Sequence, residues 1–435
     1  MASANQAGKV IKKYKLHYAW VVLLAAGVLN IVSRADSASF GVFIDPLVKL
    51  HGWTRGEVSL AYSLAFVAGL PAVMAAGWLG DRYGEQRLML VATSVIAVGT
   101  VLMGTIGQLW QLYVFYSLFV GSLGHAAFTV LLPVTITRWF HSWLGFATGL
   151  YWASLGLGPV IFAPLFRWLI ETHGWRWTFF TMGIILGSIL LLFSLLIRGR
   201  PEEKGLVAYG AVETAATAQP SRAAGGSPRG GLRAAASRPE VWYLTACHHL
   251  GCVGHAVILA HVVSMATFQG VPGVTAAGIL SVISGTSIAS RFIFSVLTER
   301  LGGRRLLTIA LVCQSAPILL LLWAHDTWAF YTFAMVFGLG YGGEMVGFPI
   351  INRQMFGTNA PLASIYSFEM VGASLGMGLG GFLGGWLFDL NGTYTWSILL
   401  AAGVGFVALP AALALPRKVA PSLSASAAPS GGGGT

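Results

Sequence analysis

Long apolar segments, separated by short polar turns, run along almost the whole chain of 435 residues. About 20 apolar residues are enough for an α-helix to cross the hydrocarbon core of a bilayer. Only 9% of the residues are charged, whereas roughly 25% are charged in a soluble domain. The sequence therefore predicts an all-α membrane protein with twelve transmembrane helices. They are expected near residues 18–44, 57–79, 88–107, 110–137, 143–168, 176–197, 241–268, 274–298, 306–324, 328–351, 361–388 and 395–415.

A charged turn between the second and third predicted helices, Gly77 to Arg87, recurs in the second part of the chain. A second landmark, Trp168 to Gly174, recurs at the same offset along the sequence. Two landmarks at one offset indicate a duplicated chain with two pseudo-symmetric six-helix bundles. The matching positions are Leu79, Asp81, Arg82, Gly84, Arg87, Trp168, Glu171 and Gly174 in the first half, and Leu297, Glu299, Arg300, Gly302, Arg305, Trp386, Asp389 and Gly392 in the second.

Composition divides the chain into five parts. Residues 18–198 and 239–416 are the expected bundles. Residues 199–238 are rich in Ala, Gly, Ser, Pro and Arg, which predicts a flexible cytoplasmic linker. Residues 1–17 form a polar, basic N-terminus, and residues 417–435 are of low complexity, which predicts a disordered tail.

Lysine and arginine are unevenly distributed between the two sets of turns. Twenty of the 26 lie in the two termini, the linker and the turns on their side of the membrane, and four lie in the opposite turns. The positive-inside rule then predicts a multi-pass protein of the cell (inner) membrane with both termini in the cytoplasm. The net charge of +11 is explained by this distribution, so we expect contact with membrane lipid and none with nucleic acid.

The turn Gly77 to Arg87, written G-x-L-x-D-R-x-G-x-x-R, resembles the signature loop of the major facilitator superfamily. The resemblance implies two six-helix halves and a gating role for Asp81, Arg82 and Arg87, with Glu299 and Arg300 in the second copy. A carboxylate at such a turn can pair with arginine and with a helix N-terminus, which would latch one conformational state. The alternative is a tight basic turn that only sets topology.

Ionisable residues within the predicted helices cost about 2.5 to 3.5 kcal/mol each, so each is a functional hypothesis. Arg34 in the first helix and Arg291 in the eighth, one from each half, suggest a clamp for a small anion. Two structural alternatives stay open. Arg34 could pair with Asp36, and Arg291 with Glu344 or Glu369.

Three carboxylates and one histidine are the candidates for proton coupling: Glu344, Glu369, Asp36 and His255. Burial in an apolar cavity disfavours an ionised carboxylate, which suits a group that loads and releases protons. For Glu369 the alternative is a hydrogen bond across a close helix contact, because glycine recurs at every fourth position after it. His255 shares a helix face with His248, and for both the alternative is a satisfied buried ring. The glycines are Gly372, Gly376, Gly380 and Gly384.

Cysteine and histidine patterns predict no cofactor. Cys247, Cys252 and Cys313 all fall in apolar segments, which supports neither a disulfide framework nor a zinc site. His248 and His255 are seven residues apart, whereas zinc-binding pairs on a helix usually lie three or four apart. We therefore expect no metal.

Several stretches resemble the monocarboxylate transporters and their bacterial oxalate–formate relatives. The resemblance implies that Arg291 binds a substrate carboxylate, and that Ser287 stands where the family has an acidic companion. The lysine of animal members would fall near Ala38 and is absent, so Arg34 is its substitute. Tyr341 and Ser287 complete the candidate substrate-binding set. The stretches are Phe40 to Ile44, Gly52 to Arg55, Val58 to Ser63, Trp139-Phe140 with Ala147 to Gly149, and Gly385 to Asp389.

Together these features predict a monomeric secondary active transporter that moves a small monocarboxylate, similar to lactate or pyruvate, by alternating access and with proton coupling. An exchanger or exporter of another organic anion or drug-like molecule is the alternative among transporters. A transport-dead membrane sensor on the same fold is the alternative outside them. An enzyme is not expected, because the sequence contains no Ser-His-Asp arrangement and no nucleotide-binding loop.

Overall fold

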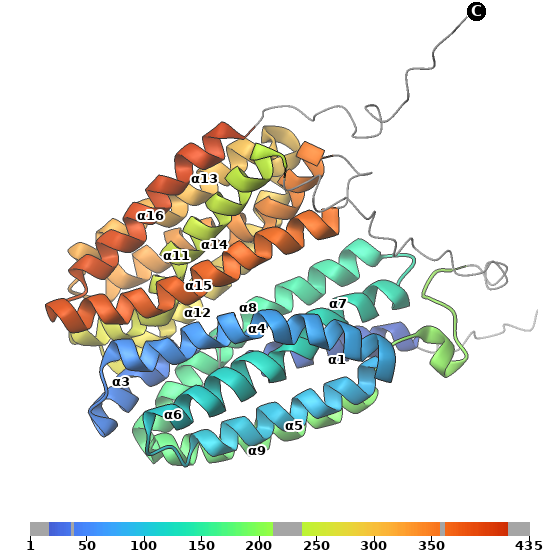
Figure 1. Cartoon of the computed structure of the whole chain (residues 1–435), viewed down its shortest axis with the longest axis horizontal. Coiled ribbons are helices and arrows are strands. Elements are labelled where there is room, and N and C mark those ends of the chain that lie inside the picture. The colour runs from blue at the N-terminus through green and yellow to red at the C-terminus, as the bar shows by residue number, and fades with distance from the viewer. Residues whose placement is uncertain (1–16, 36–38, 212–236, 357–361, 416–435) are drawn as a thin grey trace, which may run out of the picture.

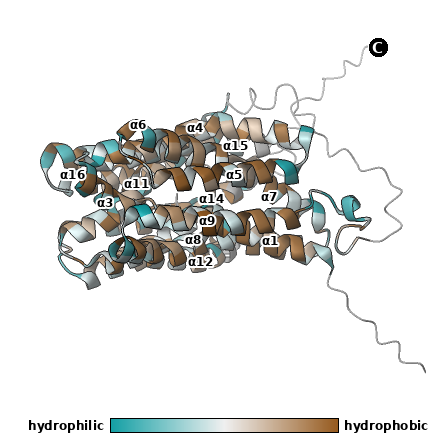
Figure 2. Ribbon diagram, turned by 90° about the horizontal axis from the view of Figure 1, so that it is seen from below, coloured by the Kyte–Doolittle hydropathy of each residue, from teal (hydrophilic) through white to brown (hydrophobic). Residues whose placement is uncertain are grey.

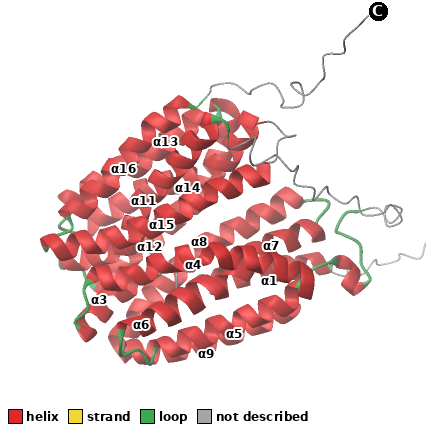
Figure 3. Cartoon of the chain, in the orientation of Figure 1, coloured by secondary structure: helices red, strands yellow, loops and turns green. Residues whose placement is uncertain are grey.

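The computed structural model describes residues 17–35, 39–211, 237–356 and 362–415. Within these ranges the chain is helical and has no strand, apart from one isolated β-bridge between Phe140 and Tyr209 (Figure 3). The helices lie roughly side by side in two groups that follow the two halves of the sequence (Figure 1).

The N-terminal half begins at Tyr18 and ends at Leu196. Its fourth crossing is continuous but changes geometry, because a π-helical stretch joins two α-helical ones. The elements are α1 (Tyr18–Ser33), α3 (Gly41–His51), α4 (Arg55–Tyr83), α5 (Glu85–Met103), α6 (Leu109–Leu112), η1 (Tyr113–Gly124), α7 (His125–Trp139), α8 (Leu144–His173) and α9 (Trp175–Leu196).

The C-terminal half begins at Pro239, which suits the first turn of a helix because that turn has amide groups without helical partners. Its third crossing ends in a 3₁₀ stretch. The elements are α11 (Pro239–Phe268), α12 (Gly273–Leu301), α13 (Gly303–Ser315), η4 (Ala316–Leu322), α14 (Thr327–Phe356), α15 (Leu362–Asn391) and α16 (Thr395–Ala414).

Eleven helical segments of the described chain are long and apolar enough to cross a membrane. Figure 2 shows hydrophobic residues along the helix lengths and hydrophilic residues gathered at their ends. The predicted first helix, 18–44, is not continuous. It is divided into α1, which is apolar but only 16 residues long, and α3. The twelfth crossing is therefore a broken one, and Arg34 lies at the break, as the C-cap of α1.

Backbone conformation repeats with the sequence. Three pairs of glycines have positive φ angles, and the members of each pair are separated by the offset of the sequence repeat: Gly52 and Gly270, Gly84 and Gly302, and Gly174 and Gly392. A side chain is strained at such angles, so glycine is the residue that ends a helix there. The turn between α4 and α5 is shorter than the sequence predicted. Helix α4 continues to Tyr83, and only Gly84 separates it from α5.

The first part of the predicted flexible linker is ordered against the N-terminal half, which corrects that prediction for residues 199–211. After η2 (Pro201–Lys204), the amide of Tyr209 donates to the carbonyl of Trp139 at 2.8 Å. The Tyr209 carbonyl accepts from the amide of His141 at 3.0 Å, and its ring packs edge-on against Trp20. Aromatic packing therefore fixes a segment whose composition suggested a linker. Residues 212–236 lie outside the described part.

The glycines at every fourth position of α15 allow it to approach α11 closely, as the sequence predicted. A Cβ added at Gly376 would overlap the carbonyl oxygen of His249, and one added at Gly380 would overlap the carbonyl oxygen of Val253. The backbones of the two helices are thus in direct contact along this line.

Replacing Gly380 by valine is expected to lower the midpoint of thermal unfolding, because overpacking of a close contact costs about 1–3 kcal/mol. Gly403→Val is the matched control. No atom lies within 4 Å of a Cβ placed there, and the residue is exposed on α16. Equal midpoints for the two variants in purified protein would contradict a role of Gly380 in this contact.

Candidate functional site

The two halves meet through α4 with α15 and through α8 with α12. On the first side, the ring of Tyr62 leaves no room for a Cβ at Gly381. On the second, the Ser281 hydroxyl donates to the carbonyl of Val160 at 3.1 Å. Toward the end where α1 begins and α16 ends, the ribbons of the same helices diverge (Figure 1). The two halves thus contact each other closely at the end away from the termini, which we call the closed end, and diverge toward the end of the termini, which we call the open end.

Arg34 projects from the break after α1 toward the other helices of its half. Its Nη2 donates to the Thr129 hydroxyl of α7 at 3.1 Å. Its guanidinium also interacts electrostatically with the phenols of Tyr151 on α8 and Tyr341 on α14. Asp36, the alternative partner and a proton-coupling candidate, lies outside the described residues. The Arg34 guanidinium therefore contacts its own half and lies within electrostatic range of Tyr341 in the second half.

Arg291 approaches the same region from α12. Its Nη1 donates to the carbonyl of Trp152 on α8 at 3.0 Å, across the boundary between the halves. It also interacts electrostatically with Tyr341. The two carboxylates that were its alternative partners, Glu344 and Glu369, have hydrogen bonds to other residues.

Tyr341 is the residue that Arg34 and Arg291 have in common. Its phenol interacts electrostatically with both guanidinium groups and with Glu344. Its ring lies edge-on to His255, with 5.1 Å between the ring centroids. Guanidinium groups from both halves thus lie within electrostatic range of one phenol, and a pair of such cations can hold an anion.

A buried His–Glu pair lies directly behind Tyr341. Nδ1 of His255 on α11 and Oε2 of Glu344 on α14 are 3.2 Å apart, and the two residues are 2% and 1% exposed. The other ring nitrogen of His255 lies 3.0 Å from the sulfur of Met377. Gly251 makes room for the carboxylate, because a Cβ there would overlap Oε1 of Glu344. A buried pair of this kind can exchange a proton internally with little change in the surrounding charge.

Glu369 belongs to a different contact. Its Oε2 accepts from the amide of Asn352 on α14 at 2.6 Å, and the residue is fully buried. This bond joins α15 to α14, whereas the glycine-lined contact of α15 is with α11. Ser287 is also fully buried, and its backbone packs against Gly342 of α14. His248 stacks on Phe348 with 3.8 Å between the ring centroids. None of these contacts involves Arg34 or Arg291.

The signature turn contributes exposed cations at the open end. Arg82 and Arg87 are both exposed. The guanidinium of Arg82 lies over the ring of Trp78 at 5.3 Å. Asp81 lies in the last turn of α4, and Glu299 and Arg300 lie in the last turn of α12. The side chains of these three residues lie outside the described part.

Sequence reasoning missed the uncharged polar residues of the centre. Thr129 and Tyr151 contact or interact with Arg34, and Tyr62 of α4 interacts electrostatically with Tyr341. Their signal in the sequence is weak, because a single hydroxyl in an apolar helix is common and its burial costs little free energy. Each lies within a predicted helix.

Comparisons with known proteins agree with this architecture. The family model for the Major Facilitator Superfamily matches residues 26–355 and 273–432. Monocarboxylate transporter 13 of Rattus norvegicus is 25% identical over 387 residues, which cover 88% of this chain and 86% of that protein. The probable sulfoacetate transporter SauU of Cupriavidus necator is 25% identical over 201 residues, 45% of each chain. The crystal structure of a bacterial homolog of the human lysosomal transporter Spinster, inward-facing and unoccupied, matches with a TM-score of 0.70 at 14% identity and covers 94% of this chain and 100% of that one.

Proposed function

This chain belongs to the Major Facilitator Superfamily and is a membrane transporter, and we propose that its substrate is a small monocarboxylate, similar to lactate or pyruvate. The observation that carries the proposal is the presence of one guanidinium from each half, Arg34 held by Thr129 and Arg291 held by the Trp152 carbonyl, within electrostatic range of Tyr341. Arg291 supplies the principal anchor, since a guanidinium presents a planar pair of donors to a carboxylate. Arg34 and Tyr341 complete the polar wall from the two halves.

Proton coupling is the second part of the proposal. An anion that enters alone against a negative membrane potential meets an opposing free energy of about 2.3 kcal/mol per charge per 100 mV. A proton carried with it removes that opposition. The buried pair of His255 and Glu344 is in contact with Tyr341 through the histidine ring. The charge of a proton bound to this pair therefore acts on the substrate site. Ser287 cannot take this role, because a hydroxyl does not ionise in this range.

Orientation follows from charge. The positive-inside rule puts the termini and the linker in the cytoplasm of the cell, and the open end of the molecule is the end of the termini. We therefore take this structure to be the state that is open to the cytoplasm. Transport then requires the halves to rock so that the other end opens.

A small organic dianion is the second candidate substrate, and the second guanidinium favours it. Arg34 and Arg291 both interact with Tyr341, so each could hold one anionic group. In that case the protein would more naturally work as an exchanger, since one proton does not neutralise two charges.

Thermal-shift screening of the purified protein separates these candidates. The panel contains monocarboxylates, dicarboxylates, sulfonated acids and lipophilic cations, each at an acidic and a neutral pH. A ligand that binds the folded state raises the unfolding midpoint by mass action. We expect lactate and pyruvate to do so, and to do so more strongly at the acidic pH. Stabilisation by lipophilic cations alone would contradict an anion site.

A further inference from the structure

The backbone amides in the first turn of α4 donate hydrogen bonds to acceptors in both halves of the molecule. Thr54 and Glu57 form a capping box within the N-terminal half, which satisfies the amide of Glu57 at the third helical position. The amides of Arg55 and Gly56, at the first two positions, remain to be satisfied. Both donate to Asp389 of α15, at 2.9 Å to Oδ1 and 2.5 Å to Oδ2. One carboxylate of the C-terminal half thus closes a helix end of the N-terminal half.

Glycine permits this close contact. A Cβ at Gly56 would lie 2.8 Å from Oδ2 of Asp389, and one at Gly385 would lie 2.7 Å from the carbonyl oxygen of Arg55. Side chains at either position would separate α4 from α15. The contact is also electrostatically favourable, because the positive end of the helix dipole faces a carboxylate.

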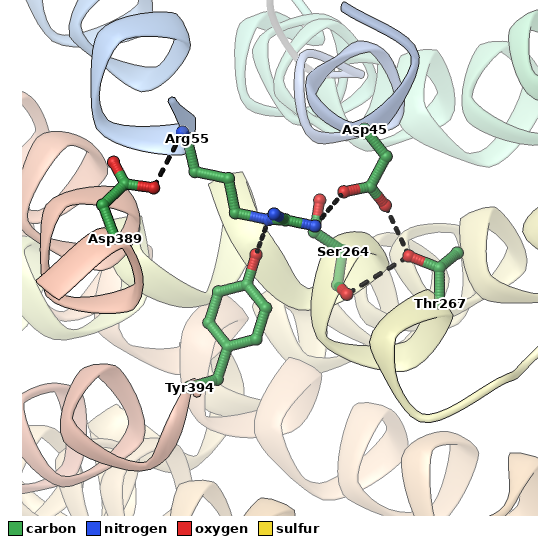
Figure 4. Close-up of polar contacts among 6 residues, drawn as sticks. All are labelled: Asp45, Arg55, Ser264, Thr267, Asp389 and Tyr394. Carbon is green, nitrogen blue, oxygen red and sulfur yellow. Dashed lines mark hydrogen bonds and ion pairs between the residues drawn. The ribbon is translucent and has the colours of Figure 1, made fainter. Parts of the chain in front are cut away.

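The side chain of Arg55 extends the contact to three further residues (Figure 4). Its Nη2 donates to Oδ1 of Asp45 at 2.9 Å, and its Nε donates to the Tyr394 hydroxyl at 3.0 Å. The other oxygen of Asp45 accepts from the hydroxyl of Thr267 on α11. Burial raises the pKa of the Tyr394 phenol, so this group stays neutral. We call these five residues the outer cluster: Asp45 and Arg55 come from the N-terminal half, and Thr267, Asp389 and Tyr394 from the C-terminal half.

The internal repeat places a second contact of the same kind on the other side of the molecule. Glu171 of α8 is the repeat counterpart of Asp389, and Gly273 at the start of α12 is the repeat counterpart of Arg55. A Cβ at Gly273 would overlap Oε1 of Glu171. Here the carboxylate accepts from Nε of Arg167 at 2.7 Å. At the second contact, Glu171 packs against the start of α12. At the first, Asp389 accepts hydrogen bonds from the amides at the start of α4.

We propose that the outer cluster is the latch that keeps the two halves together at the end away from the termini, with Asp389 as its central residue. The cluster joins helices of both halves, and it lies at the closed end. Alternating access, on which this inference rests, requires that end to open. The opening must then release Asp389 from the first turn of α4 and Arg55 from Tyr394.

Asp389→Asn tests the latch without any substrate, so its outcome is independent of the proposed function. The variant keeps the shape of the side chain but loses the charge that the helix end attracts. We expect the ratio of closed to open molecules at the outer end to fall by about tenfold, as for the loss of one charge-assisted hydrogen bond. The distances are measured by double electron–electron resonance, on a background in which Cys247, Cys252 and Cys313 are replaced by serine.

Two pairs of spin labels report the two ends. Trp110 and Trp328 are exposed equivalents in the two halves at the outer end, and Tyr83 and Leu301 are exposed equivalents at the end of the termini. Asp389→Asn should lengthen the outer distance and shorten the inner one. Glu57→Gln is the matched control, because this carboxylate caps the same helix turn but contacts only its own half. It should leave both distances unchanged.

Milder variants keep the test decisive if Asp389→Asn does not fold. Tyr394→Phe and Thr267→Val each remove one hydroxyl from the cluster and keep the packing. A shift of the outer distance in either variant, with Glu57→Gln unchanged, supports the latch. Distances in Asp389→Asn, or in both milder variants if it cannot be purified, that match those of Glu57→Gln would overturn it.

Discussion

Replacing Arg291 by alanine is expected to abolish uptake of radiolabelled lactate while the amount of protein in the membrane stays the same. Truncating one partner of a buried, hydrogen-bonded charge pair costs about 2–5 kcal/mol. Affinity for the carboxylate should therefore fall by at least about 30-fold. Uptake into cells or proteoliposomes, normalised to protein detected by immunoblot, measures this directly.

Arg291→Lys separates anion recognition from charge alone. Lysine keeps the positive charge but lacks the planar fork that matches a carboxylate, so we expect intermediate uptake. Because Arg291 also donates to the carbonyl of Trp152 across the two halves, the variants need a structural control. The spin-label distances at both ends provide it, and they should be unchanged. Normal lactate uptake by Arg291→Ala would show that this arginine is structural.

Arg34→Ala distinguishes a monoanion from a dianion. If the substrate has one carboxylate held mainly by Arg291, removal of Arg34 should reduce uptake much less than removal of Arg291. If each guanidinium holds one anionic group, the two variants should lose uptake to a similar extent. The comparison is meaningful because both side chains interact with Tyr341 but come from different halves.

Much of the fold could be predicted because a membrane restricts it so strongly. Length and hydropathy located the crossings, and the sequence repeat reappears in the backbone as paired glycines with positive φ, such as Gly84 and Gly302. The break after α1 could not be predicted in the same way. The segment that follows Ser33 contains no proline or glycine up to Phe40, so nothing in its composition marks a helix end. Tyr209 likewise docks through aromatic packing that only the folded chain brings together.

Candidate site residues could be predicted where burying a charge has a high free-energy cost. Arg34, Arg291 and Glu344 were candidates because a charged side chain in a membrane helix is costly and is kept for a function. The residues that contact them could not be predicted from the sequence. His255 and Glu344 are 89 residues apart in the chain, and no periodicity relates them. The outer cluster was missed because Asp45, Arg55 and Asp389 lie near the ends of predicted helices, where charges are inexpensive. The capping box at Thr54 was the available signal, since it leaves two amides of α4 unsatisfied.

Replacing Glu344 by glutamine is expected to abolish accumulation driven by a pH gradient and to preserve exchange of substrate between the two sides. Glutamine fills the same space and can still hydrogen-bond to His255, but it cannot carry a proton. A gradient of one pH unit corresponds to about 1.4 kcal/mol, which supports up to about tenfold accumulation if one proton moves with each substrate. Proteoliposomes with an imposed gradient measure accumulation, and the same vesicles without a gradient measure counterflow.

Glu369→Gln is the matched control for this assignment, because it removes a buried carboxylate of the same half whose hydrogen bond goes to Asn352. Since that bond joins α14 to α15 and involves neither arginine, its loss should leave gradient-driven accumulation intact and affect mainly the helix contact. The reverse pattern, with accumulation lost in Glu369→Gln and kept in Glu344→Gln, would assign the proton to Glu369 instead. Loss of both accumulation and counterflow in Glu344→Gln would instead make this carboxylate part of substrate binding, because a group that only carries the proton is not needed for exchange.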